Sequence, residues 1–371
     1  MAFTPSRLAV ARARRGLTKR KLAEAARLSE RIVAAYENPK AEAAPQPDTL
    51  ERIARVLRFP VKFFERPEID MIAPTGASFR AMSRMTAAQR GRALASGALA
   101  FELYEWLQEG FVLPEVDVPN LRPEKNPESA AQQLRIHWAL GEGSVGNMIA
   151  LLESKGIRVF SLAEEYAEVD AFSLWRDDQP FMFMNTFKSA EHSRFDAGHE
   201  LAHLVLHRHG QPGREAEREA DAFASAFLMP ANSVKNRAPR LATLDRLVAA
   251  KHEWGVSLAA LVYRMHTVGM LTDWYYERLF VEIGKRGFRT SEPEPLPREF
   301  SRVLETVFEE LRKDGITRSD IAATLDWPIA ELNALIFQIV VSGVPSGPTN
   351  RGMKPRTAGS GFPPGQLRLL G

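Results

Sequence analysis

The 371-residue chain contains no cysteine. This absence excludes disulfide bonds, cysteine nucleophiles and cysteine-ligated metals, so any zinc site must use histidine and carboxylate ligands. Long apolar runs are also missing, because no stretch approaches the roughly 18 uninterrupted apolar residues that a membrane helix needs. The N-terminus spreads four arginines among alanines and lacks the apolar core of a signal peptide. We therefore expect a soluble cytoplasmic protein with no membrane partner.

Charge is unevenly distributed along the chain, whose length predicts two or three domains. Residues 1–66 carry 15 Lys and Arg against 7 Asp and Glu, a net charge of +8, whereas the whole chain carries +3. A basic excess at one end is typical of a nucleic-acid-binding domain joined to a domain of another kind. A solvated basic surface gives the same pattern, so charge alone does not decide between the two interpretations.

Residues 6–66 have the pattern of a small helical domain. Apolar residues recur every three to four positions, which predicts five short helices with a shared core, at residues 6–15, 18–26, 29–38, 47–57 and 60–66. Thr18 and Ser29 stand at the starts of the second and third helices, where a hydroxyl can cap the free amides of the first turn. The short connection between these two helices predicts a helix-turn-helix, with its second helix in the major groove of a double-stranded DNA operator.

The predicted DNA contacts fall into two groups. One group would face the bases from the recognition helix: Ser29, Glu30 and Arg31, with Ala34 or Ala35. The other would meet phosphates from the start of the preceding helix: Thr18, Lys19, Arg20 and Lys21. The alternative is a helical interaction domain with a basic surface, because the turn at residues 26–28 lacks the glycine often found there.

Beyond residue 66 the sequence predicts a series of segments with different secondary structure. A linker leads into a helix from Thr86 to Gly110, and the proline-rich passage 114–127 follows it. Residues 129–285 mix helices with three predicted strands, at 157–162, 169–175 and 180–185. Residues 296–342 are helical, and residues 315–335 are similar to residues 16–36, which suggests a second, degenerate helix-turn-helix. The final stretch, rich in Gly, Pro and Ser, predicts disorder.

We therefore expect a multidomain, mainly α protein. The expected divisions are a helix-turn-helix domain at 1–67, a linker with a long helix at 68–128, a central α+β domain with a small sheet at 129–285, a C-terminal helical domain at 296–345 and a disordered tail at 346–371.

One short stretch carries the strongest chemical signal, His199-Glu200-Leu201-Ala202-His203. Residues four apart on a helix share a face and lie about 6 Å apart along the axis, so both imidazoles can reach one ion. The apolar residues around them, at 201, 202 and 204–206, would bury this helix. The HExxH pattern is typical of zinc hydrolases. A core helix with two hydrogen-bonded histidines is the alternative.

A hydrolytic zinc site needs a third protein ligand. His209 follows His203 by six residues, as in one class of zinc peptidase. That class has a helix-breaking glycine where this chain has Leu206, and leucine would continue the helix. The spacing therefore argues against His209.

The glutamate-rich helix predicted at 213–230 offers the other candidates for the third ligand. Its apolar positions centre on one face, from which Glu217 lies about 60° away and Glu219 about 100°. We therefore favour Glu217 and keep Glu219 as the alternate ligand. Asp221, one turn beyond Glu217, is placed to accept the free ring N–H of a ligating histidine.

The roles follow from the chemistry of such sites. His199, His203 and Glu217 would hold Zn²⁺, which polarises a scissile carbonyl and acidifies water. Glu200 would be the catalytic base that takes the proton of that water and passes it to the leaving amine. An extended substrate would pair with the edge of the strand at 169–175 or the strand at 180–185.

Taken together, these stretches resemble a known architecture, an XRE-family (Cro/C1-type) helix-turn-helix followed by an ImmA/IrrE-family metallopeptidase domain. The segments that carry the resemblance lie in the expected order over roughly residues 6–285: 16–38, 59–64, 169–175, 180–185, 193–207 and 217–230. The resemblance implies a lambda-repressor-like N-terminal domain and a zincin-like central domain. It also implies His199 and His203 as ligands, Glu200 as general base, and Glu217 or Glu219 as third ligand.

Two functions remain open at this point. One is a DNA-binding regulator whose peptidase domain cleaves a helix-turn-helix repressor or the chain itself. The other is a DNA-binding regulator or antitoxin of a toxin–antitoxin pair, whose zincin-like domain senses or dimerises without turnover. A scaffold would have no chemical need for Glu200, which favours the enzyme. A homodimer is expected, because such DNA-binding modules usually read two half-sites.

Overall fold

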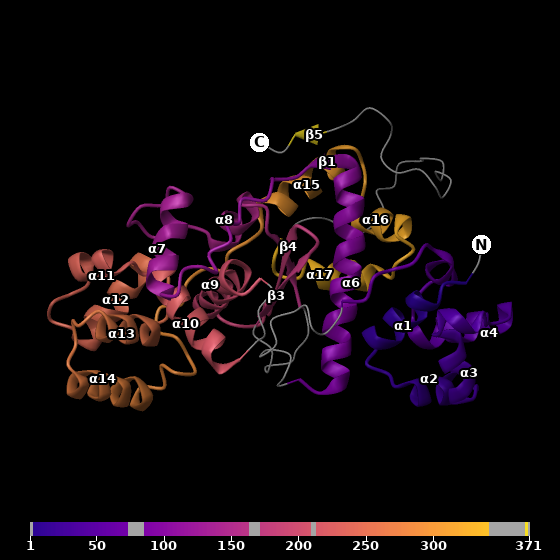
Figure 1. The fold of residues 1–371 in the computed structure, drawn as a ribbon, viewed down its shortest axis with the longest axis horizontal. Helices are drawn as coiled ribbons and strands as arrows, with labels where there is room; N and C mark the ends of the chain where they lie inside the picture. Colours follow the sequence, from indigo (N-terminus) through magenta and orange to yellow (C-terminus); the bar gives the residue numbers. More distant parts are fainter. Residues whose placement is uncertain (1–2, 73–84, 163–170, 209–212, 341–367, 370–371) are drawn as a thin grey trace.

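The computed structural model describes residues 3–72, 85–162, 171–208, 213–340 and 368–369. Its elements are arranged along one long axis (Figure 1). The N-terminal helices lie at one end, helices α11–α14 (residues 231–285) lie at the other, and a small sheet with helix α9 (Ala190–Leu206) occupies the middle. The fold is mainly helical, as the sequence predicted. Within the described residues, no helix is long and apolar enough to cross a membrane.

The N-terminal end forms the predicted helical domain. Its elements are α1 (Pro5–Arg14), α2 (Lys19–Ala26), α3 (Glu30–Tyr36), the short 3₁₀ segment η1 (Pro39–Ala41), α4 (Pro47–Leu57) and the 3₁₀ segment η2 (Val61–Glu65). The predicted caps are present, because the Thr18 hydroxyl accepts from the amide of Lys21 (3.1 Å) and the Ser29 hydroxyl from the amide of Ile32 (3.3 Å). The fifth predicted helix is the 3₁₀ segment η2.

The turn between α2 and α3 forms without glycine. Arg27 adopts the left-handed conformation there, with φ 55°, and its amide bonds back to the carbonyls of Ala23 and Glu24. This conformation usually favours glycine, because a Cβ crowds the following carbonyl. The absence of glycine, which argued against a helix-turn-helix, is therefore accommodated by an arginine in a strained position.

Helix α6 (Ala87–Gly110) connects the N-terminal domain to the sheet. It begins at a capping box formed by Thr86 and Gln89, close to its predicted start. Figure 1 shows α6 standing between the N-terminal helices and the strands. Near its C-terminal end, the rings of Phe101 and Tyr104 pack edge-on against Phe181 of the sheet. Strand β1 (Phe111–Val112) follows and pairs in parallel with β5 (Arg368–Leu369). The rest of the predicted disordered tail lies outside the described residues.

The three predicted strands form one sheet. They are β2 (Arg158–Ser161), β3 (Ala171–Arg176) and β4 (Gln179–Met184), in the order β2-β4-β3. Strand β4 is central, parallel to β2 and antiparallel to β3. The sequence left open which of the later two strands is an edge. It is β3, because no strand among the described residues pairs with its outer side.

Helices cover and extend this sheet. The first are α7 (Pro127–His137), α8 (Met148–Ser154), α9 (Ala190–Leu206) and α10 (Arg214–Leu228). The others are α11 (Ala231–Arg237), α12 (Leu244–Trp254), α13 (Leu258–Thr267) and α14 (Asp273–Lys285). Helices α9 and α10 pack closely at Gly198, where an added Cβ would stand 3.3 Å from the Cβ of Ala224. This close approach brings the side chains of α10 within reach of the histidines on α9.

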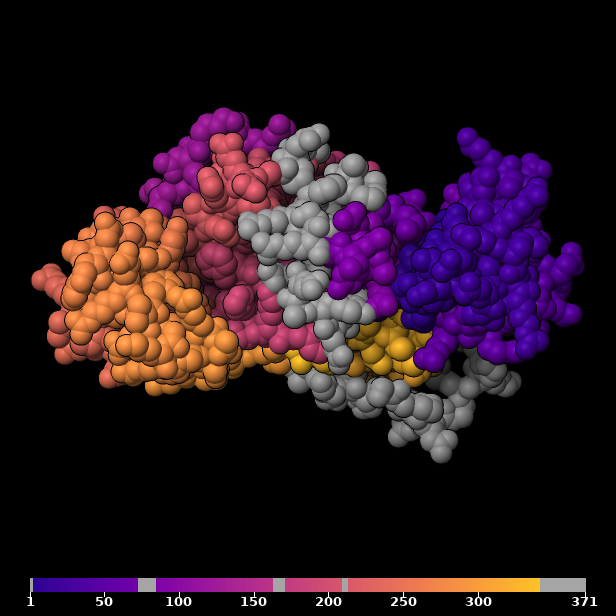
Figure 2. Space-filling view, turned by 90° about the horizontal axis from the view of Figure 1, so that it is seen from below, coloured from indigo at the N-terminus to yellow at the C-terminus, as the bar shows by residue number. Residues whose placement is uncertain are grey.

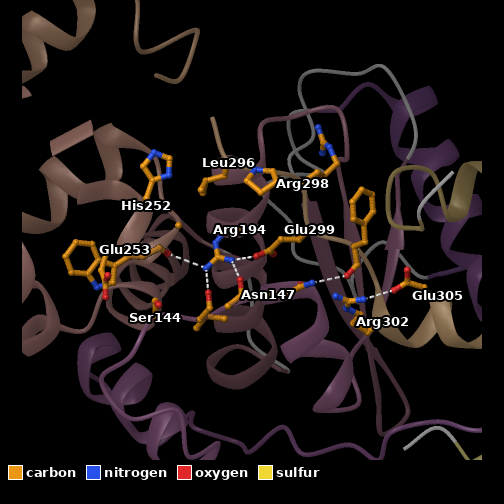
Figure 3. Close-up of a pocket in the computed structure, with 16 residues that line it drawn as sticks. Ser144, Asn147, Arg194, His252, Glu253, Leu296, Arg298, Glu299, Arg302 and Glu305 are labelled. Carbon is orange, nitrogen blue, oxygen red and sulfur yellow. Dashed lines mark hydrogen bonds and ion pairs between the residues drawn. The ribbon is translucent and has the colours of Figure 1, made fainter. Parts of the chain in front are cut away.

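Arg194 joins α9 to the loops around it. Its guanidinium donates to the carbonyls of Val145 (2.6 Å), Gly146 (3.1 Å) and Trp254 (3.3 Å), and it forms an ion pair with Glu299. These groups line a cleft of about 520 Å³ between the end of α12 and the segment that leads to α15 (Figure 3). Arg194 therefore connects α9 to three other segments at this cleft: the loop at residues 145–146, the end of α12 and the segment that contains Glu299.

The C-terminal helices are α15 (Arg302–Lys313), α16 (Arg318–Thr324) and α17 (Ile329–Leu335), as predicted. Helix α15 starts on the central domain, where the buried carboxylate of Glu153 accepts from the Ser301 hydroxyl and from the amides of Arg302 (2.9 Å) and Val303 (3.2 Å). Helix α17 lies against α6. The space-filling view shows this region reaching the surface beside the N-terminal domain (Figure 2).

Candidate metal centre

Three histidines form a row along α9. The helix begins at Ser189, whose hydroxyl accepts from the amide of His192 (3.2 Å), and it runs without interruption to Leu206. His199 and His203 therefore lie one turn apart on the same face, as predicted. His207, the C-terminal cap of α9, extends the row by another turn. The ring centroids of neighbouring histidines are 4.9 and 5.1 Å apart.

Two of these histidines meet a glutamate of α10. The Nε2 atoms of His199 and His203 are 3.2 Å apart. Oxygens of the Glu217 carboxylate lie 3.4 Å from Nε2 of His199 and 3.6 Å from Nε2 of His203. Glu217 is 5% exposed and His203 is 8% exposed, so the group lies largely inside the protein. Within the described residues, these three form the one group whose spacing suits a metal ion.

The spacing matches what zinc requires. Bonds of about 2.0–2.1 Å at tetrahedral angles place neighbouring ligand atoms roughly 3.3–3.4 Å apart. The two nitrogens are 3.2 Å apart, and the nitrogen–oxygen distances of 3.4 and 3.6 Å, each to a different oxygen of Glu217, also lie close to that range. Two imidazole nitrogens and one carboxylate oxygen also leave a fourth position free, as hydrolytic zinc sites need. The residues present therefore fit a zinc ion.

The outward ring nitrogens of both histidines have partners. Nδ1 of His199 lies 2.8 Å from the Asp221 carboxylate, the position predicted for that residue. Nδ1 of His203 lies 3.1 Å from Nδ1 of His207. Nε2 of His207 in turn lies 2.8 Å from the Glu219 carboxylate. Glu219, the alternate ligand in the sequence, thus contacts His207, while His209 lies outside the described residues.

The pKa values of His199 and His203 are shifted in opposite directions. Burial lowers the pKa of His199, but hydrogen bonds with Asp221 and Glu217 and the charge of Glu200 outweigh burial and raise that pKa to about 10. Burial, together with the charges of His199 and His207, holds the pKa of His203 well below its usual value. The pair therefore presents one protonated and one neutral imidazole, and a metal ion must displace the proton of His199 to bind.

Glu200 lies on the side of α9 that faces the sheet. It is 4% exposed, and its carboxylate accepts a hydrogen bond from the Ser173 hydroxyl of β3 (2.7 Å). Trp175, two residues along β3, donates to the carbonyl of Leu204 (3.2 Å). The edge strand is therefore fixed directly over the HExxH helix. No motif in the sequence points to Ser173, which stands 27 residues before Glu200.

Asp196 adds a buried acid one turn before the centre. Its carboxyl lies 3.9 Å from the Lys188 ammonium. Burial raises the pKa of Asp196 to about 6, and the charge of Glu200 adds to this effect. Glu200 therefore has a second buried carboxyl group nearby, which the HExxH motif alone does not predict.

The predicted DNA contacts lie on the outer surface of α2 and α3. Those of the recognition helix are exposed: Ser29, Glu30 and Arg31. Among the phosphate contacts, Lys19 lies 3.5 Å from Glu37 and Arg20 lies 3.6 Å from Glu24, while Lys21 is exposed. Thr18 also caps α2. Most residues of both predicted groups are thus accessible at the surface.

Comparison with protein families identifies two regions of the chain. The helix-turn-helix family model matches residues 8–64, which hold α1–α4. The M78 peptidase family model, described as an IrrE N-terminal-like domain, matches residues 152–266, which hold the sheet and the histidine row. No curated protein matches the chain. Helix α6 and the helices from α14 onward lie outside both matches. The chain therefore joins a helix-turn-helix DNA-binding domain to an IrrE-like domain of the M78 peptidase family.

Proposed function

We propose that this protein is a transcriptional regulator whose M78-type domain is a zinc-dependent endopeptidase. The observation that carries the proposal is the close grouping of two imidazole nitrogens, 3.2 Å apart, with the Glu217 carboxylate, whose two oxygens lie 3.4 Å from His199 and 3.6 Å from His203. His199, His203 and Glu217 would hold the ion. Glu217 is preferred to Glu219 because it contacts both ligating histidines, whereas Glu219 contacts His207. Bound zinc would supply a Lewis acid that polarises a peptide carbonyl and acidifies water.

Glu200 is the residue proposed to move the proton. A carboxylate beside the site can take a proton from the attacking water and return it to the nitrogen of the leaving amine. Ser173 donates to one oxygen of Glu200, which fixes the orientation of the carboxylate. Ser173 is thus a positioning residue that acts through Glu200.

The edge strand indicates the class of substrate. Strand β3 has a free outer edge among the described residues, and it lies over the HExxH helix through Ser173 and Trp175. An extended peptide that adds to this edge would run past Glu200 with its backbone hydrogen-bonded. This geometry suits a segment of a protein chain. We propose a helix-turn-helix repressor, or an accessible segment of the protein itself, as the substrate.

The N-terminal domain would bring this activity to DNA. Lys21 and Arg31 lie exposed on the face that α2 and α3 share, where they would meet phosphates and bases. Operators of such domains usually contain two half-sites, so we propose that the protein binds as a homodimer.

A second function is favoured by the environment of Glu200. Its carboxylate is 4% exposed and already hydrogen-bonded to Ser173. A base held in this way would suit a metal-stabilised module that senses a signal or binds a toxin partner without turnover. The two functions differ in whether peptide bonds are cleaved.

Cleavage is tested with the zinc-loaded full-length protein and a library of protein-derived peptides, with products read by mass spectrometry. The endopeptidase proposal expects a set of internal cuts that disappears with Glu200→Gln while the zinc remains bound. Glu215→Gln, an exposed glutamate on α10, is the matched control and should keep the activity. A zinc-loaded protein that cuts no peptide, with or without DNA, would leave the second function in place.

A further inference from the structure

The C-terminal helices repeat the N-terminal helix-turn-helix at an offset of 299 residues. Gly16 and Gly315 both have positive φ, at 63° and 75°. The next features also coincide, since Thr18 and Thr317 cap the following helices through their hydroxyls. The turn then places Arg27 and Asp326 in the left-handed region, with φ 55° and 54°. Helices α16 and α17 therefore correspond to α2 and α3.

The buried positions of the two units agree as well. The apolar residues inside α2 and its turn are Leu22, Ala23 and Ala26. The residues at the same positions of the second unit are Ile321, Ala322 and Leu325, and these are also buried. Val33 of α3 corresponds to the buried Leu332 of α17. The matching backbone conformations and buried positions identify residues 302–335 as a second helix-turn-helix, which we call the C-terminal unit.

The C-terminal unit lacks the side chains that read DNA. The exposed residues at the start of α3 are Ser29, Glu30 and Arg31, and their counterparts are Pro328, Ile329 and Ala330. None of these three side chains has a hydrogen-bond donor, so none can contact a base edge or a phosphate through one. Two of the three basic positions at the start of α2 are also changed, because Ser319 and Asp320 replace Arg20 and Lys21, while Arg318 replaces Lys19.

One position that is exposed in α3 is covered by protein in α17. Glu331, which corresponds to the exposed Ile32 of α3, is 3% exposed. Its two oxygens accept from Nε of Arg14 and a terminal nitrogen of Arg15, each at 2.6 Å. Arg14 is the last residue of α1 in the N-terminal domain, and Arg15 is the C-terminal cap of that helix. The position that faces outward in the first unit thus binds a basic helix in the second.

Neighbouring contacts extend this interface. Arg66 donates to the carbonyl of Thr324 (2.8 Å) and the carboxylate of Asp326 (3.2 Å) in the C-terminal unit. Glu102 of α6 accepts from Trp327 of that unit (3.1 Å) and pairs with Arg7 of α1 (2.7 Å). Part of the N-terminal basic excess therefore serves contacts within the chain. The exposed basic residues of α2 and α3 remain available to DNA.

We propose that the C-terminal unit is a protein-binding helix-turn-helix whose second helix, through Glu331, binds the basic C-terminal end of α1 in the DNA-binding domain. The C-terminal unit therefore binds a protein helix that ends in two arginines, whereas the N-terminal helix-turn-helix would bind DNA. The same unit is tied to the central domain at the start of α15 by Glu153. It thereby fixes the DNA-binding domain relative to the domain that carries the histidine row.

The absence of cysteine allows a direct test, because introduced cysteines can be spin-labelled selectively. Labels at the exposed positions Glu51 of α4 and Glu309 of α15 report the distance between the two units by pulsed electron paramagnetic resonance. We expect one narrow distance distribution in the full-length protein. Glu331→Arg should broaden it, and the added changes Arg14→Glu and Arg15→Glu should narrow it again, which a folding defect would not allow.

Glu305→Arg, a charge reversal elsewhere on α15, is the control and should leave the distance distribution narrow. An unchanged distribution in Glu331→Arg would overturn the proposal. The DNA side is tested with a random-sequence duplex titrated at several salt concentrations. Lys21→Ala should lower the logarithmic salt slope by about one unit. Arg318→Ala should leave that slope unchanged, and a drop would show that the C-terminal unit contacts DNA.

Discussion

The row of histidines predicts that His207 controls how tightly the site holds zinc. If Nε2 of His203 faces the ion, its Nδ1 carries the proton and donates to Nδ1 of His207, 3.1 Å away. His207 must then carry its own proton on Nε2, which donates to Glu219 over 2.8 Å. This chain fixes the ring of His203 without touching the metal. His207→Phe keeps a planar aromatic ring at this position and removes both hydrogen bonds.

The size of the effect follows from the kind of contact. Loss of a hydrogen-bond partner behind a metal ligand typically lowers affinity 10- to 100-fold. The partner of His203 is a neutral imidazole, whereas His199 has the carboxylate of Asp221 at 2.8 Å. Because charge-assisted hydrogen bonds are about twice as strong, we expect roughly a 10-fold loss for His207→Phe and a larger loss for Asp221→Ala. A 10-fold loss corresponds to about 1.4 kcal/mol.

The assay is a competition for zinc between the protein and a chromogenic chelator. His252→Phe, on α12 and outside the site, is the control and should match the parent protein. Glu219→Gln should weaken binding less than His207→Phe, because the amide oxygen still accepts from Nε2 of His207. Equal zinc affinities for His207→Phe and the parent would refute the orienting role. No zinc binding in any variant would instead count against the site itself.

Three further predictions concern stability. Burial raises the pKa of Glu153 to about 7, so its favourable contribution is present below about pH 4.5 and is lost as the pH rises through 7. Glu153→Gln should remove this dependence and stabilise the protein at pH 8 by at most about 3 kcal/mol, as chemical unfolding at several pH values will show. Arg27→Gly should relieve the left-handed turn and add about 1 kcal/mol in urea unfolding, and a loss would contradict the strain. Gly198→Leu should cost about 1–3 kcal/mol and reduce zinc affinity, because α9 and α10 would be forced apart at Ala224, and an unchanged melting temperature would refute this.

Much of this could be predicted because local patterns fix local structure. The caps at Thr18 and Ser29 and the apolar runs at 157–162 and 180–185 give boundaries that the structure confirms within one or two residues, whereas residues 169–170 of the other predicted strand lie outside the described residues. The spacing of His199 and His203 places both rings on one helical face whatever the rest of the chain does. These features depend on neighbours in the sequence.

Other features depend on packing between distant segments. The distances from Glu217 and Glu219 to the histidines are set by how closely α10 approaches α9, which helical angles only suggested. Ser173 reaches Glu200 because β3 is an edge strand, and the order of strands is a tertiary property. No motif in the sequence distinguishes Glu331, and only the docking of α17 against α1 shows why it is buried.

The zinc content of the purified full-length protein tests the central claim most directly. Elemental analysis after zinc is supplied and excess is removed should give about one zinc per chain. The His199→Ala, His203→Ala double variant should hold none, while His252→Phe should match the parent. A parent protein that retains no zinc would contradict the assignment of His199, His203 and Glu217 as ligands, and with it the proposed peptidase activity.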